Sequence, residues 1–240
     1  MATHYCSKDD VSAFLQVSNF TGDTTPNTDA VEAFINMAEE RIDQLTDHAW
    51  HTSRAKAVTE ERGRIQRVTT NSVNDRGRIQ LRHYPILDMD NGTDKLHIWD
   101  GGNYVEYIAG KTGDDTITNI TGKDYWIDKE RGTIYLNSYN QFNLLSDAPS
   151  GVTAYVTYRY ATATTPADIK QATIYFASAM IAMNDDLNLM QEGDDSMDNS
   201  TKSQRFEEMA MKILKDGRRL GRSMPIARAI GGLGVGRLTS

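Results

Sequence analysis

The stretch Val152-Thr153-Ala154-Tyr155-Val156-Thr157-Tyr158-Arg159-Tyr160 alternates between a largely apolar and a more polar set of side chains. This period of two is typical of a β-strand with one buried face. The stretch Thr165-Pro166-Ala167-Asp168 then places a hydroxyl, a proline and an acid where helices favour them at their start. The sequence therefore predicts that the chain changes from strand to helix between residues 160 and 166.

The helix after this junction is predicted over residues 166–188 and is apolar on more than one side. Its first apolar face is formed by Ile169, Ala172, Phe176, Met180, Met183 and Leu187. A second apolar surface is formed by Ala177, Ala179, Ile181 and Ala182. A helix of this kind has to be buried on both sides, either by its own domain or by a neighbouring copy of the chain.

Three further helices are predicted outside the middle of the chain. A short one follows Ser7, which forms a capping box with Asp10. A longer one carries an apolar stripe over residues 31–49, and its charged residues, Glu39 and Asp43 among them, are placed off that stripe on the exposed side. The last one starts near residue 200 and ends at a glycine close to residue 217 or 221.

The residues between these helices have a different composition. Nine of the 11 tyrosines lie between Tyr84 and Tyr160, whereas nine of the ten methionines lie outside residues 51–164. Short strands separated by turns are predicted at residues 64–68, 78–82, 96–99, 104–108, 125–128, 133–136 and 152–160. Strands of this length with frequent turns are typical of a small barrel or sandwich.

The predicted fold class is therefore α+β, with a small bundle of about four helices and an inserted antiparallel β-barrel or β-sandwich domain. The helical domain is assigned to residues 1–50 and 164–221, and the inserted β domain to residues 51–163. Residues 222–240 are glycine-rich, cannot form a core alone and are predicted to be an extended C-terminal arm. The arm continues a basic stretch, since seven basic residues and one acid follow from Lys212 onward.

Composition and motifs argue against several functions. The net charge of -7 argues against a protein that coats nucleic acid, and no apolar run approaches the roughly 20 residues of a membrane helix. The sequence contains neither Gly-x-Ser-x-Gly nor His-Glu-x-x-His, and the Gly231–Gly236 run lacks the strand and helix of a phosphate loop. We therefore predict no catalytic residue, metal site or cofactor, and no enzymatic activity.

The order of these elements resembles the head–tail connector (adaptor) proteins of tailed bacteriophages and tailed archaeal viruses. The resemblance covers roughly residues 8–215, and its most suggestive part is the strand followed by Pro-Ala-Asp-Ile-Lys-Gln-Ala at 166–172. The other segments that carry it are residues 10–15, 38–46, 84–86, 125–128, 132–136 and 156–160. Small members of the family have only the helical part, so the β domain from about residue 51 to 160 departs from the minimal pattern.

The resemblance implies a structural virion protein in the neck, at the head–tail junction, which is assembled in the host cytoplasm. Such a protein forms a ring, usually of twelve copies, beneath the portal protein. The ring extends the DNA channel and offers a platform to the next neck or tail protein. Viral DNA then passes through without sequence-specific binding, and no membrane is involved.

Two sets of residues are assigned roles on this basis. Arm residues Arg228 and Arg237 would pair with portal acids, while Ile230, Val235 and Leu238 would fill pockets or add an edge strand. The contact between ring subunits is placed on one face of the helix after the junction, at Phe176, Met180, Met183 and Leu187.

A second class of function stays open, namely a carbohydrate- or protein-binding module that works through the tyrosine-rich β domain. Its aromatic residues Trp99, Tyr104, Tyr107 and Trp126 would then be exposed. In an adaptor most of these side chains are expected to lie in the core, because alternating aromatic residues usually do.

Overall fold

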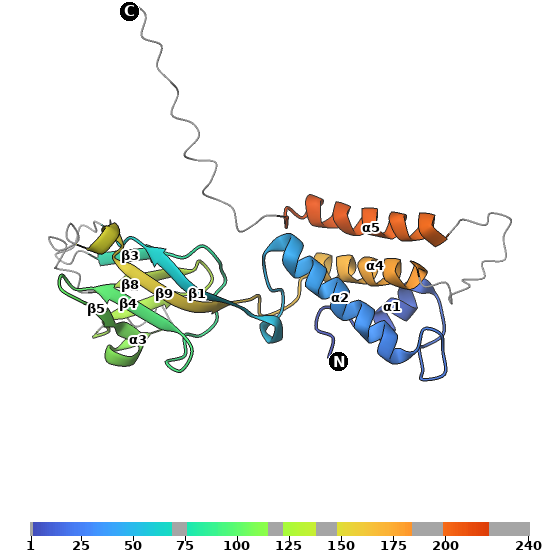
Figure 1. Cartoon of the computed structure of the whole chain (residues 1–240), viewed down its shortest axis with the longest axis horizontal. Helices are drawn as coiled ribbons and strands as arrows, with labels where there is room; N and C mark the ends of the chain where they lie inside the picture. Colours follow the sequence, from blue (N-terminus) through green and yellow to red (C-terminus); the bar gives the residue numbers. More distant parts are fainter. Residues whose placement is uncertain (1, 69–75, 115–121, 138–147, 184–198, 221–240) are drawn as a thin grey trace, which may run out of the picture. The chain divides into compact units, whose positions relative to one another are not determined.

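A computed structural model describes residues 2–68, 76–114, 122–137, 148–183 and 199–220 of the 240-residue chain (Figure 1). The chain divides into two compact units, one made of Met1–His48 with Thr165–Ser240 and the other of Ala49–Thr164. The first unit is helical and the second is built mainly from strands, so the predicted α+β fold is confirmed. The expected arm at residues 222–240 lies outside the described residues.

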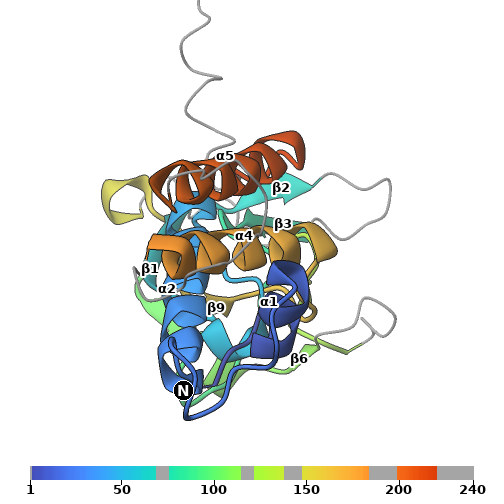
Figure 2. The same cartoon turned by 90° about the vertical axis from the view of Figure 1, so that its right-hand side faces the viewer.

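The helical unit is assembled from both ends of the chain. Its helices are α1 (Lys8–Leu15), α2 (Thr28–Thr46), α4 (Ala167–Met183) and α5 (Asn199–Asp216). Helix α4 contacts each of the other three and forms the centre of the unit (Figure 2). Helices α2 and α5 run in the same general direction, and α4 runs against them (Figure 1).

The first two helices begin at the expected caps. The Ser7 hydroxyl accepts a hydrogen bond from the Asp10 amide at 3.2 Å, and the Asp10 carboxylate accepts one from the Ser7 amide at 2.9 Å. The Asn27 side chain accepts a hydrogen bond from the Ala30 amide at 2.9 Å at the start of α2. Each bond satisfies a donor that a helix N-terminus leaves without a partner within the helix.

The β unit consists of two sheets around one core. The first sheet has the order β1 (Lys56–Gly63), β9 (Ala154–Tyr160), β4 (Lys95–Trp99), β5 (Tyr104–Glu106). The second has the order β2 (Gln66–Val68), β3 (Arg76–Gln80), β8 (Thr133–Leu136), β7 (Tyr125–Asp128), β6 (Gly113–Asp114). A single cluster of buried apolar side chains draws residues from both sheets, as in a two-layer sandwich. Among the described strands, only β6 and β7 pair in parallel.

Strand β9 has the alternation that the sequence predicts. Its residues Ala154, Val156, Tyr158 and Tyr160 are buried, whereas the intervening side chains are partly exposed. The strand pairs with β1 on one side and β4 on the other, and both pairings are antiparallel. Burial of one face of this central strand fixes the register of the first sheet.

Two strand predictions need correction. The strand expected at 104–108 ends at Glu106, and a single helical turn, α3 (Tyr107–Gly110), follows. The reason is the Glu106 carboxylate, which accepts a hydrogen bond from the Ile108 amide at 3.0 Å and so caps the turn. Strand β1 was not expected, because its charged residues lack a clear alternation; it lies at the edge of its sheet, where charged side chains are common.

Candidate assembly surfaces

Helix α4 is buried mainly by its own chain. Its two apolar sides therefore do not need a neighbouring copy to cover them, which was the other possibility. Phe176 is 0% exposed, and the Arg41 guanidinium lies 4.5 Å above the centre of its ring. Arg41 comes from α2 and also forms an ion pair of 2.7 Å with Glu207 of α5. Arg41 therefore covers the Phe176 ring from α2 while it is itself held by α5, and the side chain has no exposed surface to offer to another copy.

The remaining residues of the expected subunit contact differ from Phe176. Met180 is partly exposed, and Met183, at the end of α4, is 67% exposed. Leu187 lies outside the described residues, as do the arm residues Arg228, Ile230, Val235, Arg237 and Leu238. Of the four residues predicted to form the contact between ring subunits, Met180 and Met183 are thus the two that the structure describes as at least partly exposed.

Aromatic contacts join α5 to the rest of the helical unit. The Phe14 ring of α1 meets the Tyr175 ring of α4 edge to face at 4.9 Å and the Phe206 ring of α5 at 5.5 Å. Ring pairs in this geometry are worth about 0.5–1.5 kcal/mol beyond their buried area. Together with the Arg41–Glu207 ion pair, they hold α5 over α4.

The end of α5 is fixed to the start of α4. Arg219 donates from Nε to Asp168 Oδ2 at 2.7 Å, and its backbone amide bonds to the Leu214 carbonyl at 2.9 Å. Arg218 adopts the left-handed conformation with φ of 51°, which turns the chain back toward the helix. The last described residues before the arm are therefore held at the end of the helical unit where α4 begins.

The N-terminal segment is held against α2 by two buried carboxylates, which sequence reasoning missed. Glu39 Oε1 accepts hydrogen bonds from the amides of His4 at 2.6 Å and Tyr5 at 2.7 Å. The Tyr5 hydroxyl donates to Asp43. Glu39 and Asp43 are therefore buried. The prediction that they lie on the exposed side of the helix, beside the apolar stripe, is wrong. The correction has a physical reason, because hydrogen bonds from the N-terminal segment compensate for loss of water.

Two observations on the described residues concern the cysteine and candidate metal ligands. Burial raises the pKa of Cys6 to about 12, and the charges of Glu39 and Asp10 add to the effect, so the thiol stays protonated. No cluster of three or more His, Cys, Asp or Glu side chains suited to a metal ion occurs among the described residues. The described helices also include none with the length and apolar character to span a membrane.

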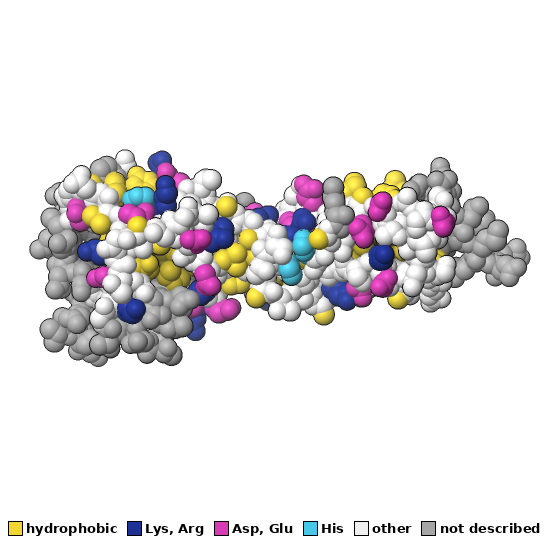
Figure 3. Space-filling model, turned by 90° about the horizontal axis from the view of Figure 1, so that it is seen from below, with side chains coloured by type: hydrophobic (Ala, Val, Ile, Leu, Met, Phe, Trp, Pro, Cys, Tyr) yellow, Lys and Arg dark blue, Asp and Glu magenta, His cyan; other side chains and the backbone are white. Residues whose placement is uncertain are grey.

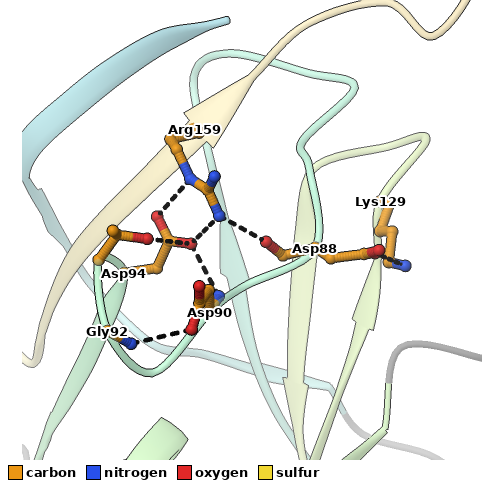
Figure 4. A network of polar contacts seen from close by, with 7 residues as sticks. Asp88, Asp90, Gly92, Asp94, Lys129 and Arg159 are labelled. Atoms are coloured by element: carbon orange, nitrogen blue, oxygen red, sulfur yellow. Dashed lines mark hydrogen bonds and ion pairs between the residues drawn. The ribbon is translucent and has the colours of Figure 1, made fainter. Parts of the chain in front are cut away.

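A polar network fixes the loop between β3 and β4 in the β unit (Figure 4). Arg159 of β9 forms an ion pair of 2.9 Å with Asp94, whose side chain is 2% exposed, and donates to the Asp88 carbonyl at 3.1 Å. Asp94 also accepts a hydrogen bond from the Asp90 amide at 2.8 Å, and Lys129 pairs with the Asp88 carboxylate. The hydrogen bond to Asp94 raises the pKa of Arg159 above its usual range. The network is internally paired, which indicates a structural role.

The outer surface of the helical unit offers a hollow and several exposed methionines. The hollow measures about 520 Å³ and is lined by α5 residues Gln204, Glu207, Glu208, Met211, Lys212, Lys215 and Asp216. Met37 of α2 is 55% exposed and Met209 of α5 is 47% exposed. Figure 3 shows acidic and basic side chains interspersed on one face of the molecule, so the described residues there form no continuous basic band for DNA.

The aromatic side chains of the β unit are mostly inside it. Trp99 and Trp126 are buried, and the Trp126 ring stacks on Tyr135 at 4.9 Å with an angle of 11° between the rings. Tyr104 and Tyr107 are partly exposed. Two of the four aromatic residues on which a binding module would depend are thus buried, which is half of them rather than the majority expected for an adaptor.

We expect acrylamide to quench the tryptophan fluorescence of the folded chain only weakly. All three tryptophans, Trp50, Trp99 and Trp126, are buried, so the quencher cannot reach their rings by diffusion through water. A Stern–Volmer titration of the native protein, with the urea-unfolded protein as the exposed reference, measures this. Quenching of the native protein as strong as that of the reference would contradict the burial and revive the binding module.

Comparison with known proteins gives only distant similarities. No family model matches the chain, and none of the curated proteins gives a significant match. A chain in the virion of a native gene transfer agent (GTA) particle is 13% identical with a TM-score of 0.39, covering 86% of this chain and 92% of its own. A chain in the neck of an empty GTA particle, computed with C6 symmetry, is 12% identical with a TM-score of 0.37, over 82% and 87%. Such low values establish neither a shared fold nor a shared role.

Proposed function

We propose that the chain is a structural virion protein, a head–tail adaptor that forms a ring of about twelve copies beneath the portal. In this role it extends the DNA channel and joins the capsid to the neck or tail. One observation carries the proposal. The segments that resemble adaptor proteins at either end of the chain fold together as one helical unit, although the whole β unit separates them in the sequence. Residues 10–15, 38–46 and 166–172 of the resemblance therefore belong to a single unit, while its other segments lie in the β unit.

The internal packing of α4 changes where the ring contact has to be placed. Because α1, α2 and α5 of the same chain bury α4, a neighbouring copy is not needed to cover its apolar sides. The contact between copies then has to use outer surfaces. Met183, the hollow on α5 and the exposed methionines of α2 and α5 are the described apolar surface available for it.

The partners follow from the same proposal. The arm at 222–240 reaches the portal, with Arg228 and Arg237 facing acids and Ile230, Val235 and Leu238 filling apolar pockets. The opposite side of the ring receives the next neck or tail protein. DNA passes through without sequence-specific contacts, and the protein acts without catalysis or cofactor. The chain assembles in the host cytoplasm and remains in the virion neck.

Removal of residues 224–240 is expected to abolish assembly onto portal without unfolding the chain, because the contacts described for the helical unit are made by residues before position 221. The test mixes purified portal with the full or the truncated chain and images the particles by negative-stain electron microscopy. The full chain should add a ring beneath the portal and the truncated chain should not. Equal rings from both chains would contradict the arm assignment.

A charge variant that keeps the arm at full length sharpens this test. Arg228→Glu with Arg237→Glu reverses both charges that are proposed to face portal acids. The matched control, Lys95→Glu with Lys111→Glu, makes the same charge change at two exposed sites of the β unit. We expect the arm variant to bind portal at least about tenfold more weakly than the control. Equal binding would show that the arm charges do not face the portal.

A further inference from the structure

An outer face of α2 carries acidic side chains around a methionine. Residues spaced by three or four positions share one face of a helix, and this face consists of Asp29, Ala33, Met37, Glu40 and Gln44. Together with Asp47, the left-handed residue that directly follows the helix, they are named the acidic strip. All six residues are exposed, and all three charges are negative. Arg41, the arginine of this helix, lies to one side and is paired with Glu207. The acidic strip therefore presents the exposed Met37 side chain among residues whose only charges are negative.

An outer face of α5 carries the opposite charge around another methionine. It consists of Lys202, Arg205, Met209, Lys212 and Asp216, the basic strip. Met209 is 47% exposed, close to the 55% of Met37. Three positive charges lie on the strip with Met209, and its acid, Asp216, lies at the C-terminal end. The exposed Glu208 borders the strip between Arg205 and Lys212. The two strips thus carry opposite charges, and each has an exposed methionine of similar accessibility.

The spacing of the two strips matches when the helices lie parallel. Asp29 precedes Met37 by about 12 Å along α2, and Lys202 precedes Met209 by about 10.5 Å along α5. With the two methionines opposite each other, Asp29 faces Lys202 and Glu40 faces Lys212. Gln44 then faces Asp216, so no like charges meet. In the antiparallel arrangement Asp29 would face Asp216, which is unfavourable.

The direction of the helices makes this pairing compatible with a closed ring. Helices α2 and α5 of one chain run in the same general direction (Figure 1). Rotation about an axis leaves directions along that axis unchanged. When the ring axis lies along these helices, α2 of one copy therefore also runs parallel to α5 of the next. Contact between two different faces of identical chains is the kind that generates rings.

We propose that the acidic strip on α2 of one copy docks on the basic strip on α5 of the next copy. The occupant of each strip is thus a second copy of this chain, chosen by charge complementarity and by the matching methionines. The inference rests on the proposed function, because it supplies the lateral contact of the adaptor ring. It replaces Phe176 in that role with the pair Met37 and Met209.

Disulfide trapping tests this contact in the full-length protein. The double variant Met37→Cys with Met209→Cys is expected to form a ladder of cross-linked oligomers under mild oxidation, since each copy then carries both halves of the contact. Packed helices lie about 8–10 Å apart, which brings facing cysteines within reach of a disulfide. Cys6 is the native cysteine and is buried, so it contributes little background.

The single variants are the matched controls. Met37→Cys alone and Met209→Cys alone should give no ladder, and a mixture of the two should stop at the dimer. A second measurement uses charge. Glu40→Lys should lower the ladder yield of the double variant about tenfold, and adding Lys212→Glu should restore it. Asp23→Lys, the same change at an exposed loop site, should leave the yield unchanged.

Each outcome separates the contact from the function. Absence of a ladder, equal cross-linking by either single variant, or failure of Lys212→Glu to restore the yield would overturn the contact. A chain that adds a ring to portal but gives no ladder would retain the adaptor function and lose this interface. A chain that forms the ladder but never binds portal would retain the interface and lose the adaptor function.

Discussion

Phe176→Ala is expected to lower the free energy of unfolding of the helical unit by about 3–5 kcal/mol. Phe176 is completely buried at the centre of the unit, and its ring contacts the Arg41 guanidinium. The alanine variant would lose the buried aromatic surface and leave a cavity between α2, α4 and α5, which packed helices can fill only in part. Loss of the ring also removes the cation–π contact that helps to position Arg41 for Glu207.

The matched control for this prediction is Met183→Ala on the same helix. Met183 is 67% exposed, so its truncation should change the free energy of unfolding by no more than about 0.5 kcal/mol. Urea unfolding followed by the helical circular dichroism signal measures both variants. A loss below about 1 kcal/mol for Phe176→Ala, combined with a defect in ring assembly, would contradict the burial and return Phe176 to the subunit contact.

Arg159→Ala is expected to destabilise the β unit by about 3 kcal/mol. Arg159 is the ion-pair partner of Asp94, and the Asp94 side chain is almost fully buried. Without the guanidinium, the buried Asp94 side chain has no cation beside it, which costs more than the loss of the bond itself. The loop at Asp88 would also lose its hydrogen bond to Arg159 and its attachment to β9.

Arg62→Ala in the first sheet is the control for Arg159→Ala. Arg62 pairs with Glu60 at 2.9 Å, but its side chain is 67% exposed, so we expect its removal to leave the stability of the β unit nearly unchanged. All three tryptophans belong to the β unit, so tryptophan fluorescence during urea unfolding reports on this unit. Equal stability losses for Arg62→Ala and Arg159→Ala would contradict the structural role of the Asp94 network.

Local signals in the sequence predicted much of the fold. The alternation in β9, the Ser7–Asp10 capping box and the stripe of α2 each depend on neighbours within a few residues, and the structure confirms them. The strands at 125–128 and 133–136 are likewise present as β7 and β8. Patterns of this kind are visible without knowledge of tertiary contacts.

The missed features depend on contacts between distant residues. Glu39 is buried because the amides of His4 and Tyr5 donate hydrogen bonds to it. The periodicity of α2 does not predict these partners. Strand β1 has few apolar residues because it lies at a sheet edge. The short turn α3 is the exception, because its cap is local: the Glu106 carboxylate accepts a hydrogen bond from the Ile108 amide two residues further on. Long-range contacts can override the local preferences of a segment.

The prediction of assembly surfaces was affected in the same way. The two apolar sides of α4 are visible in the sequence, but whether its own chain or a neighbour covers them depends on the placement of α2 and α5. Once these helices cover α4, the outer strips on α2 and α5 become the relevant surface. Their charges and methionines are visible in the sequence, but their exposure is not.

The central claim, that this chain is a ring-forming adaptor, is tested most directly by electron microscopy of the full-length protein mixed with purified portal. We predict an additional closed ring beneath the portal, coaxial with it and continuous with its channel. Portal particles that look the same with and without the protein, at concentrations well above those needed for assembly, would contradict the claim.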